Sequence, residues 1–310
     1  MEEKIEIMNL LQSKQVLEHE LQSLAYGSVE IRENESNKYI YVHYREDGVA
    51  LTKYVGEYSD ELYNLVLNNS IKAKQLKRQI REITKKLKKL NYTEEELSEK
   101  VEQNIDFAKR HLVDTIYKQA ILEGVATTFA DTESIIEGGK VNNMTSEDIL
   151  KIVNLKHAWE FILNKNVILS DTNFALLCEI NKMVEEGFYY TAGKVRNTPV
   201  TIGGTTWKPD LPIESVIKEE LEEIFNKELN DVDRAIELLL YTMKKQVFID
   251  GNKRTAVIYS NHYLISKGKG IIAIPAELTE EFKDLLIPYY EGRDEKEIKK
   301  FIKEKCYMSI

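Results

Sequence analysis

The sequence predicts a mainly α-helical fold: a helical bundle with an inserted β-hairpin, preceded by a small β-meander and helices. Three observations lead to this prediction. Apolar residues recur at helical spacing through most of residues 93–310. Short aromatic and β-branched runs alternate with turn residues between 26 and 57. Finally, the segment 191–212 alternates in polarity and then turns, as a hairpin does.

Residues 1–92 form the predicted N-terminal appendage. It starts with a helix over residues 1–25. Three short strands follow, and a meander of that size is stable only when it packs on another element. The expected strands lie near 29–32, 39–44 and 51–55.

A basic amphipathic helix over residues 71–90 completes the appendage. Its apolar positions recur at helical spacing: Leu76, Ile80, Ile83 and Leu87. Nine Lys and Arg residues stand there against the single acid Glu82. Two interpretations are open, a solvated face balanced by acidic neighbours, or a docking surface for an acidic protein or a nucleic acid.

The rest of the chain predicts one helical domain over residues 93–310, with the boundary at Asn91 and Tyr92. It shows no internal repeat and no low-complexity linker. The expected helices lie near 94–124, 146–164, 172–186, 212–227, 231–246, 253–267, 278–289 and 294–305.

Composition excludes several classes of protein. The net charge of -9 over 310 residues makes nucleic acid an unlikely general partner, because phosphate contacts need an excess of Lys and Arg. Two cysteines, Cys178 and Cys306, are too few for a disulfide scaffold and form no metal-ligand pattern. No apolar stretch has the length of a signal peptide or a membrane span. We therefore expect a cytoplasmic protein without membrane contact.

The strongest functional signal is the short loop between the helices expected at 231–246 and 253–267. Gly251 lets the backbone turn tightly and approach a ligand. The first N–H groups of the second helix then form an anion site, to which Lys253 and Arg254 add positive charge.

The same loop offers a metal ligand and an anchor. Asp250 is a hard oxygen ligand suited to Mg²⁺ bridging two phosphates, and Phe248 is expected to point inward and fix the loop. An ordinary helix–turn–helix corner with surface charges is the structural alternative.

This loop resembles the signature of the Fic (Fido) family, H-x-F-x-[D/E]-G-N-[G/K]-R. Six positions match: Phe248, Asp250, Gly251, Asn252, Lys253 and Arg254. The resemblance implies a Fic-type bundle, bound Mg²⁺, ATP as donor and a protein target, since most members transfer AMP to a protein hydroxyl. Lys253 followed by Arg254 looks most like the Doc branch, which transfers phosphate.

Two further segments are similar to family elements. The segment 193–209 looks like the flap, which holds the target as an added strand. Its expected target-binding residues are Ile202, Gly203, Gly204 and Thr205. The segment 132–138 looks like the inhibitory segment, in which Glu137 would disturb the γ-phosphate position.

Three positions depart from the family pattern. Gln246 stands where the family has the histidine that acts as general base, and an amide is not a base at neutral pH. Val257 replaces the second arginine, so Glu137 would need another partner, such as Lys253 or Arg254. Glu133 replaces the expected Ser or Thr. His262 is expected to be a structural histidine rather than a substitute base.

These features favour a protein-modifying nucleotidyltransferase with a weakened site, in which Gln246 orients the target hydroxyl. The alternatives are a pseudoenzyme that binds nucleotide or a protein segment without catalysis, and a Doc-like phosphotransferase. The resemblance also implies that the chain can form a homodimer, because Fic domains often pair.

Overall fold

The computed structural model describes residues 2–34, 37–46, 49–90, 92, 97–142, 144–293 and 295–310. It divides into two compact units, Met1–Glu95 and Glu96–Ile310, and each is described here by itself. The boundary expected at Asn91 and Tyr92 adjoins residues outside the described ranges and stays a prediction.

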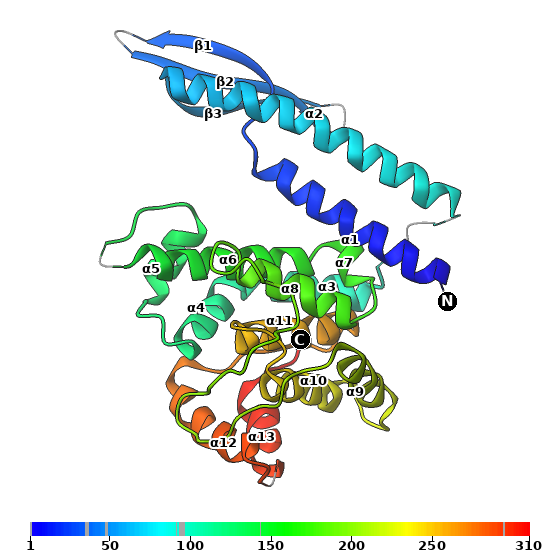
Figure 1. Ribbon diagram of the computed structural model, residues 1–310. Helices are drawn as coiled ribbons and strands as arrows, with labels where there is room; N and C mark the ends of the chain where they lie inside the picture. Colours follow the sequence, from blue (N-terminus) through cyan, green and yellow to red (C-terminus); the bar gives the residue numbers. More distant parts are fainter. Residues whose placement is uncertain are drawn as a thin grey trace. The chain divides into compact units, whose positions relative to one another are not determined.

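The first unit contains two helices and one sheet (Figure 1). The sheet is antiparallel with strand order β1-β2-β3, which confirms the predicted meander. Ser59 caps the long helix, since its Oγ accepts a hydrogen bond from Leu62 N at 3.1 Å. The elements are α1 (Glu2–Ser23), β1 (Ser28–Asn34), β2 (Asn37–Glu46), β3 (Val49–Glu57) and α2 (Asp60–Lys89).

One face of this sheet is buried and the other is rich in tyrosine. Ile40 and Val42 point to the same side of β2 and form a core with Val66 of α2. Tyr41, which lies between them, points to the other side, where its ring centroid is 5.4 Å from that of Tyr54 on β3. The meander therefore gains its stability from α2.

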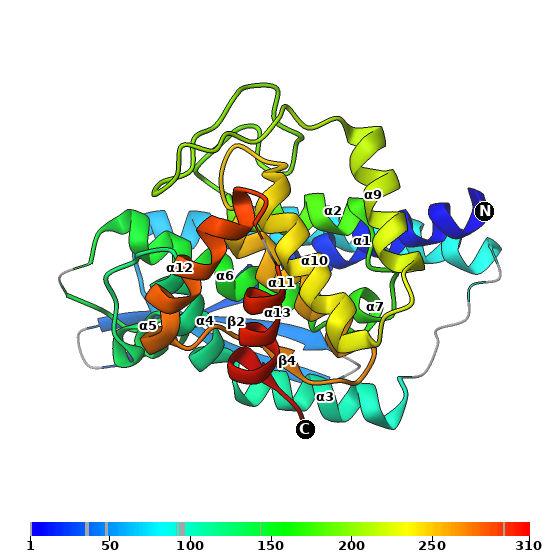
Figure 2. The ribbon, with the colours of Figure 1, turned by 90° about the horizontal axis from the view of Figure 1, so that it is seen from below.

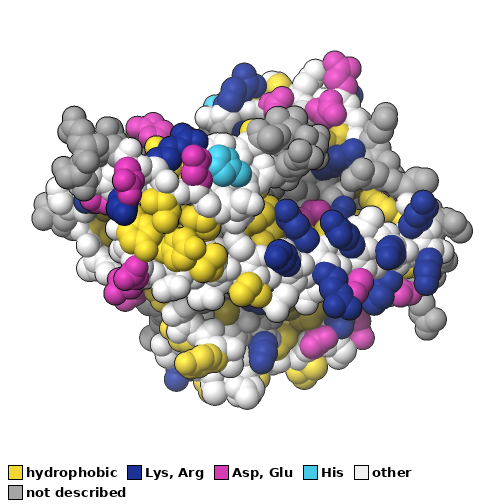
Figure 3. Space-filling view, turned by 90° about the horizontal axis from the view of Figure 1, so that it is seen from above, with side chains coloured by type: hydrophobic (Ala, Val, Ile, Leu, Met, Phe, Trp, Pro, Cys, Tyr) yellow, Lys and Arg dark blue, Asp and Glu magenta, His cyan; other side chains and the backbone are white. Residues whose placement is uncertain are grey.

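The outer face of α2 is strongly basic. Figure 3 shows Lys and Arg side chains gathered along it. Two of these cations have acidic partners, Lys72 with Glu20 of α1 at 2.5 Å and Arg78 with Glu82 at 3.2 Å. Both interpretations of this face, a solvated surface and a docking surface, stay predictions. The exposed cations are Lys72, Lys74, Arg78, Arg81, Lys85, Lys86, Lys88 and Lys89.

The second unit is a helical bundle built around α11 (Asn252–Ser266). Nearly every side chain of α11 is buried, which is the pattern of a helix surrounded by others. It packs on helices α10, α8, α6 and α3 (Figures 1 and 2). The remaining helices are α3 (Glu99–Arg110), α4 (Leu112–Leu122), α5 (Phe129–Ile136), α6 (Ser146–Ile162), α7 (Lys165–Ile168), α8 (Phe174–Val184), α9 (Glu214–Asn226), α10 (Asp231–Lys245), α12 (Thr279–Tyr290) and α13 (Lys296–Phe301).

Short elements complete this unit. Strands β4 (Ile271–Ile272) and β5 (Tyr307–Met308) pair in antiparallel fashion and tie the chain's last residues to the segment after α11. A 3-10 turn over Ala276–Leu278 precedes α12, and a π-turn over Ile302–Cys306 follows α13. Within the described residues, no helix is both long and apolar enough to cross a bilayer.

The β-hairpin predicted at 191–212 is wrong. These residues contain no strand and run as an irregular loop (Figure 2). Side-chain contacts hold the loop in place of cross-strand pairing. Among them, the ring of Trp207 stacks on that of Tyr290 with centroids 5.7 Å apart.

Candidate nucleotide-binding site

The loop between α10 and α11 begins and ends with a left-handed residue. Gln246 has φ 48° and ψ 58°, and it is the one residue other than glycine with positive φ in the part of the chain that the structure describes. Gly251 has φ 72°. Such a conformation costs a non-glycine residue about 1–3 kcal/mol, so other contacts must hold Gln246 in place.

The side chain of Gln246 supplies those contacts. Its Nε2 donates to Met243 O at 2.7 Å, and its Oε1 accepts from Asn252 Nδ2 at 3.1 Å. Both ends of the amide are therefore engaged within the loop. In this arrangement Gln246 closes the end of α10, and its amide keeps one N–H and one oxygen lone pair beyond these two bonds.

Phe248 and Asn252 form the interior of the loop. Asn252 Oδ1 accepts from Phe248 N at 3.0 Å, and its Nδ2 donates to Phe248 O at 2.9 Å. The ring of Phe248 is 1% exposed, as the sequence predicted for an anchor. These two residues shape the loop, so they position the start of α11.

The start of α11 presents free backbone donors. The first hydrogen bond of the helix runs from Thr255 N to Gly251 O at 2.8 Å. The N–H groups of Asn252, Lys253 and Arg254 precede it and lie at the positive end of the helix dipole. A helix start of this geometry can hold an anion, and its use as a phosphate site stays a prediction.

Asp250 lies beside these donors with its side chain 52% exposed. Its Oδ1 accepts from Gly251 N at 2.7 Å, and its Oδ2 lies 3.6 Å from Arg254 Nη2. No cluster of three or more metal-ligating side chains occurs among the described residues. One carboxylate still fits Mg²⁺, which is commonly held by one or two carboxylates together with substrate phosphates and water.

Arg254 differs from expectation, because it is buried among carboxylates. Its side chain is 3% exposed, and Nη2 lies 2.7 Å from Glu185 Oε1. Asp250 Oδ2 lies 3.6 Å from the same nitrogen, and Glu123 Oε2 lies 3.9 Å from Nε. Lys253 Nζ also pairs with Glu123, at 3.6 Å. Two cations thus face three carboxylates.

Glu185 is one of the site residues that were not predicted from the sequence. It directly follows α8 and is 2% exposed. Burial raises the pKa of its carboxyl to about 7, although the Arg254 guanidinium pulls that pKa down. A Cβ on Gly251 would lie 2.4 Å from Glu185 Oε1, so this carboxylate lies directly over the loop.

Asn181 of α8 connects three parts of the site and was also missed. Its Nδ2 donates to Asp250 O at 3.0 Å and to Thr255 Oγ1 at 3.1 Å. Its Oδ1 accepts from Gly193 N at 2.8 Å. One buried amide therefore connects the loop between α10 and α11, called here the phosphate loop, to α11 itself and to the start of the segment 193–209, called here the flap segment.

Arg196 anchors the flap segment to the loop. Its Nε donates to Gln246 O at 2.6 Å. Its two terminal nitrogens donate to Thr198 O at 2.8 Å and Asp210 O at 2.6 Å. A single buried guanidinium thus holds both ends of the irregular segment against the end of α10.

The predicted target-binding residues lie at the tip of this segment. Gly203 and Gly204 are exposed, whereas Ile202 and Thr205 are half-buried. Thr205 Oγ donates to Glu291 Oε1 at 2.8 Å. The tip therefore rests on the end of α12 while the backbone of the two glycines remains accessible.

The structure does not bring Glu137 to the phosphate loop cations. It is exposed at the end of α5, where its N–H donates to Glu133 O at 2.9 Å. Among the residues described, no ion pair joins it to Lys253 or Arg254, whose acidic partners are given above. Glu137 thus does not form the expected ion pair with Lys253 or Arg254 among the described residues, and its inhibitory role stays a prediction.

His262 has the structural role that the sequence favoured. It is fully buried, its Nε2 donates to Val167 O at 2.8 Å, and its Nδ1 accepts from Thr172 Oγ at 2.8 Å. Burial lowers its pKa to about 4, so the ring is neutral at physiological pH. With both nitrogens engaged, it cannot substitute for the missing base.

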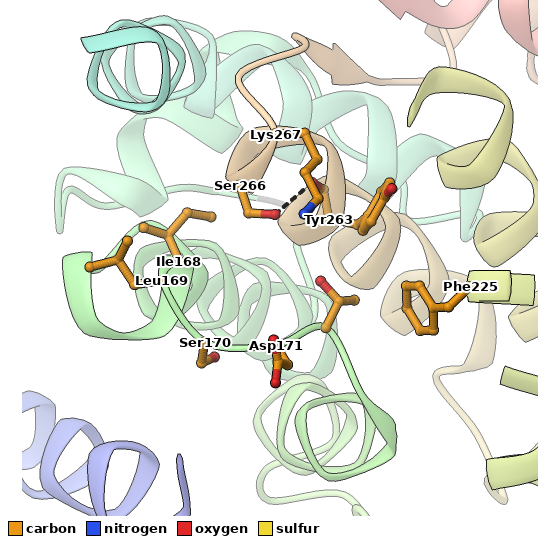
Figure 4. Close-up of a pocket in the computed structure, with 9 residues that line it drawn as sticks. Ile168, Leu169, Ser170, Asp171, Phe225, Tyr263, Ser266 and Lys267 are labelled. Atoms are coloured by element: carbon orange, nitrogen blue, oxygen red, sulfur yellow. Dashed lines mark hydrogen bonds between the residues drawn. The ribbon is translucent and has the colours of Figure 1, made fainter. Parts of the chain in front are cut away.

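A separate pocket of about 360 Å³ lies at the far end of α11 (Figure 4). None of the site residues predicted from the sequence lines it. Its walls mix apolar and polar groups, and Ser266 Oγ donates to Tyr263 O at 2.7 Å within it. The lining residues are Ile168, Leu169, Ser170, Asp171, Thr172, Phe225, Tyr263, Ser266 and Lys267.

One family model matches the part of the chain that contains the phosphate loop. A family model described as Fic/DOC family matches residues 171–264, which span Asn181, Glu185 and the phosphate loop. Among curated proteins, none matches this chain.

Three solved structures share the fold. Fic-1 from C. elegans has a TM-score of 0.53 at 17% identity, covering 79% of this chain and 73% of that one. A Fic family protein from Desulfovibrio desulfuricans G20 gives 0.52 at 13%, covering 68% and 73%. A Fic domain containing signaling protein from Bacteroides thetaiotaomicron gives 0.51 at 19%, covering 61% and 75%. The family model matches residues 171–264 of the 310 in this chain, and these structures, at 13–19% identity, show the fold that the chain shares with them.

Proposed function

From this family match and the shared fold we propose that the chain belongs to the Fic family, and that its unit Glu96–Ile310 transfers AMP from ATP to a hydroxyl group of another protein, through a weakened site. The observation that carries the proposal is the loop before α11, where three free N–H groups and Lys253 lie beside the exposed carboxylate of Asp250. In the reaction, the hydroxyl oxygen bonds to the α-phosphorus, the bond to pyrophosphate breaks, and the hydroxyl proton must go to a base.

Each residue then has a defined task. Asp250 would hold Mg²⁺, which when bound neutralises phosphate charge and orients the leaving pyrophosphate. The N–H groups at the start of α11 would hold phosphate oxygens, with Lys253 as a point charge. The exposed backbone of Gly203 and Gly204 would accept a segment of the target protein by main-chain hydrogen bonds.

Gln246 is the weak point of this site. An amide can orient a hydroxyl group but cannot take its proton, and loss of a general base typically costs about 10²–10⁴ in rate. Its Nε2 and Oε1 each hold one partner already, Met243 O and Asn252 Nδ2, so the second N–H and the second oxygen lone pair would be left for a target hydroxyl. We therefore expect slow transfer, unless the target brings its own base.

A pseudoenzyme is the second candidate, and two contacts favour it. The amide of Gln246 is satisfied at both ends, and Arg254 is already surrounded by carboxylates. A site of this kind would bind nucleotide, or only a protein segment along the flap, without transfer. A phosphotransferase of the Doc kind is a third candidate, because Lys253 stands where AMP-transferring members commonly have glycine.

Calorimetric titration with ATP, with and without Mg²⁺, tests the nucleotide site. We expect binding that depends on Mg²⁺ and that Asp250→Ala removes. Asp171→Ala is the matched control, since that exposed aspartate lies near the opposite end of α11. Undiminished binding by the Asp250 variant would contradict the role given to its carboxylate.

Transfer is tested with ATP labelled at the α- or the γ-phosphate and with Gln246→His. If the site lacks only its base, this variant should raise incorporation of α-label into protein by about 10²–10⁴, and Gln246→Ala should not. Incorporation of γ-label alone would favour phosphate transfer. A Gln246→His protein that binds Mg·ATP and transfers neither label would favour the pseudoenzyme.

A further inference from the structure

The carboxylate of Glu185 lies 2.7 Å from Arg254 Nη2 and close to Gly251, beside the helix start to which the proposed function assigns a phosphate. We propose that Glu185 is a built-in competitor of that phosphate, and that it sets the affinity and the resting state of the nucleotide site. This inference rests on the proposed function, because it assumes that phosphates bind at the start of α11.

The first support is the incomplete pairing between the two side chains. Glu185 Oε1 lies 2.7 Å from Arg254 Nη2, yet neither group forms a well-aligned hydrogen bond at this contact. Strong Arg–carboxylate pairs are commonly bidentate, with two parallel N–H···O bonds. A pair built only for stability would be expected to have that geometry, and this one does not.

The second support is a set of unused donors. Among the described residues, no hydrogen-bond partner reaches the buried atoms Nε and Nη1 of Arg254. Buried donors of a charged group are costly when they stay unpaired, so native proteins rarely leave them so. Two empty donors on a side chain that is 3% exposed indicate that a second acceptor belongs beside it. A phosphate carries enough oxygens to fill both.

The third support is the position of the Glu185 carboxylate relative to the loop. Its Oε1 lies 2.4 Å from the point that a Cβ of residue 251 would occupy, and Gly251 directly precedes α11. An anion at this place faces the positive end of the helix. The Glu185 carboxylate therefore contacts the two groups that a bound phosphate is expected to contact, the Arg254 guanidinium and the start of α11.

Charge balance decides the direction of the effect. Glu123 and Asp250 lie beside the cations Arg254 and Lys253, and Glu185 adds a further negative charge whenever it is ionised, so the resting site does not attract an anion. Binding of Mg²⁺ at Asp250 would offset part of this excess. A phosphate would still have to displace Glu185 from Arg254 or bind against its charge, and either event weakens binding.

A purely structural Glu185 gives the opposite expectation. If the carboxylate only held Arg254 in place for the phosphate, neutralising it would loosen Arg254 and weaken nucleotide binding. The sign of the change in affinity therefore separates competition from positioning.

The experiment is calorimetric titration of the full chain with Mg·ATP and with inorganic triphosphate, comparing the native protein with Glu185→Gln. We expect the variant to bind both probes about 5- to 150-fold more tightly, the usual range of coupling between two sites. Glu186→Gln is the matched control, because it removes the same charge from the exposed neighbour. Glu185→Asp, which keeps the charge but withdraws it from Arg254, should also bind more tightly, and it keeps the test open if Glu185→Gln does not fold.

The possible outcomes separate the two proposals. If the native protein binds Mg·ATP and the folded Glu185 variants bind no more tightly or more weakly, the competitor role is wrong while the nucleotide site stands. If only the Glu185 variants bind, the competitor role is supported in its strongest form. If no protein binds either probe, there is no phosphate site at α11, and both proposals fail.

Discussion

Replacing Glu185 by Gln should change the pH dependence of folding stability. Glu185 is 2% exposed, and burial raises the pKa of its carboxyl from 4.5 to about 7 despite the nearby Arg254. Since the folded state favours the protonated acid, the side chain's contribution to stability is fully present below pH 4.5. That contribution is lost as the pH rises toward the folded pKa of about 7.

The size of the effect follows from the pKa difference. One pKa unit corresponds to about 1.4 kcal/mol, so the shift amounts to roughly 3 kcal/mol of unfolding free energy. Glutamine imitates the neutral acid and does not titrate. Relative to the variant, the native protein should therefore lose about 3 kcal/mol between about pH 5 and about pH 8.

Urea unfolding followed by tryptophan fluorescence measures this directly. The two tryptophans of the chain, Trp159 and Trp207, both lie in the unit Glu96–Ile310, so the signal reports that unit alone. Urea unfolding curves of the native protein, Glu185→Gln and the control Glu186→Gln, recorded at a series of pH values, give the unfolding free energy at each pH. Other titrating groups cancel in the difference between native protein and variant.

The sign of that difference can refute the reasoning. If the native protein gains stability over Glu185→Gln as the pH rises, Arg254 outweighs burial, and the pair is a strong ion pair. A difference that does not vary with pH would mean that Glu185 has the same pKa in the folded and unfolded chain. Either result would contradict the pKa direction on which the prediction depends.

Three further substitutions test other parts of the site. Gly251→Ala should lower the unfolding free energy by about 1–3 kcal/mol, because a side chain at φ 72° is strained and its Cβ would meet Glu185; unchanged urea midpoints would contradict this. His262→Ala should cost about 2–4 kcal/mol, seen as a lower Tm, through a cavity and two lost hydrogen bonds, and it should leave Mg·ATP affinity unchanged. Arg196→Ala should speed proteolytic cleavage within 191–212, because three bonds to backbone carbonyls are lost, and equal cleavage rates would show that other contacts hold the segment.

The sequence by itself determined the parts of this protein that depend on neighbouring residues. Helical periodicity predicted the bundle, and alternation with turns predicted the meander of β1, β2 and β3. The loop from Phe248 to Arg254 could be recognised because its glycine, its anchor, its acid and the start of α11 are contiguous. Local patterns of this kind are set by backbone geometry over a few residues, which a sequence displays directly.

Only the tertiary structure decided what surrounds that loop. Asn181 lies in α8, Glu185 directly follows α8 and Glu123 directly follows α4, and no spacing in the sequence connects them to Arg254. The segment 191–212 alternates like a hairpin, but long-range bonds from Arg196 hold it as an irregular loop. Burial and charge pairing between distant segments fix these features, because the energy of a buried ion or amide depends on which groups the fold brings around it.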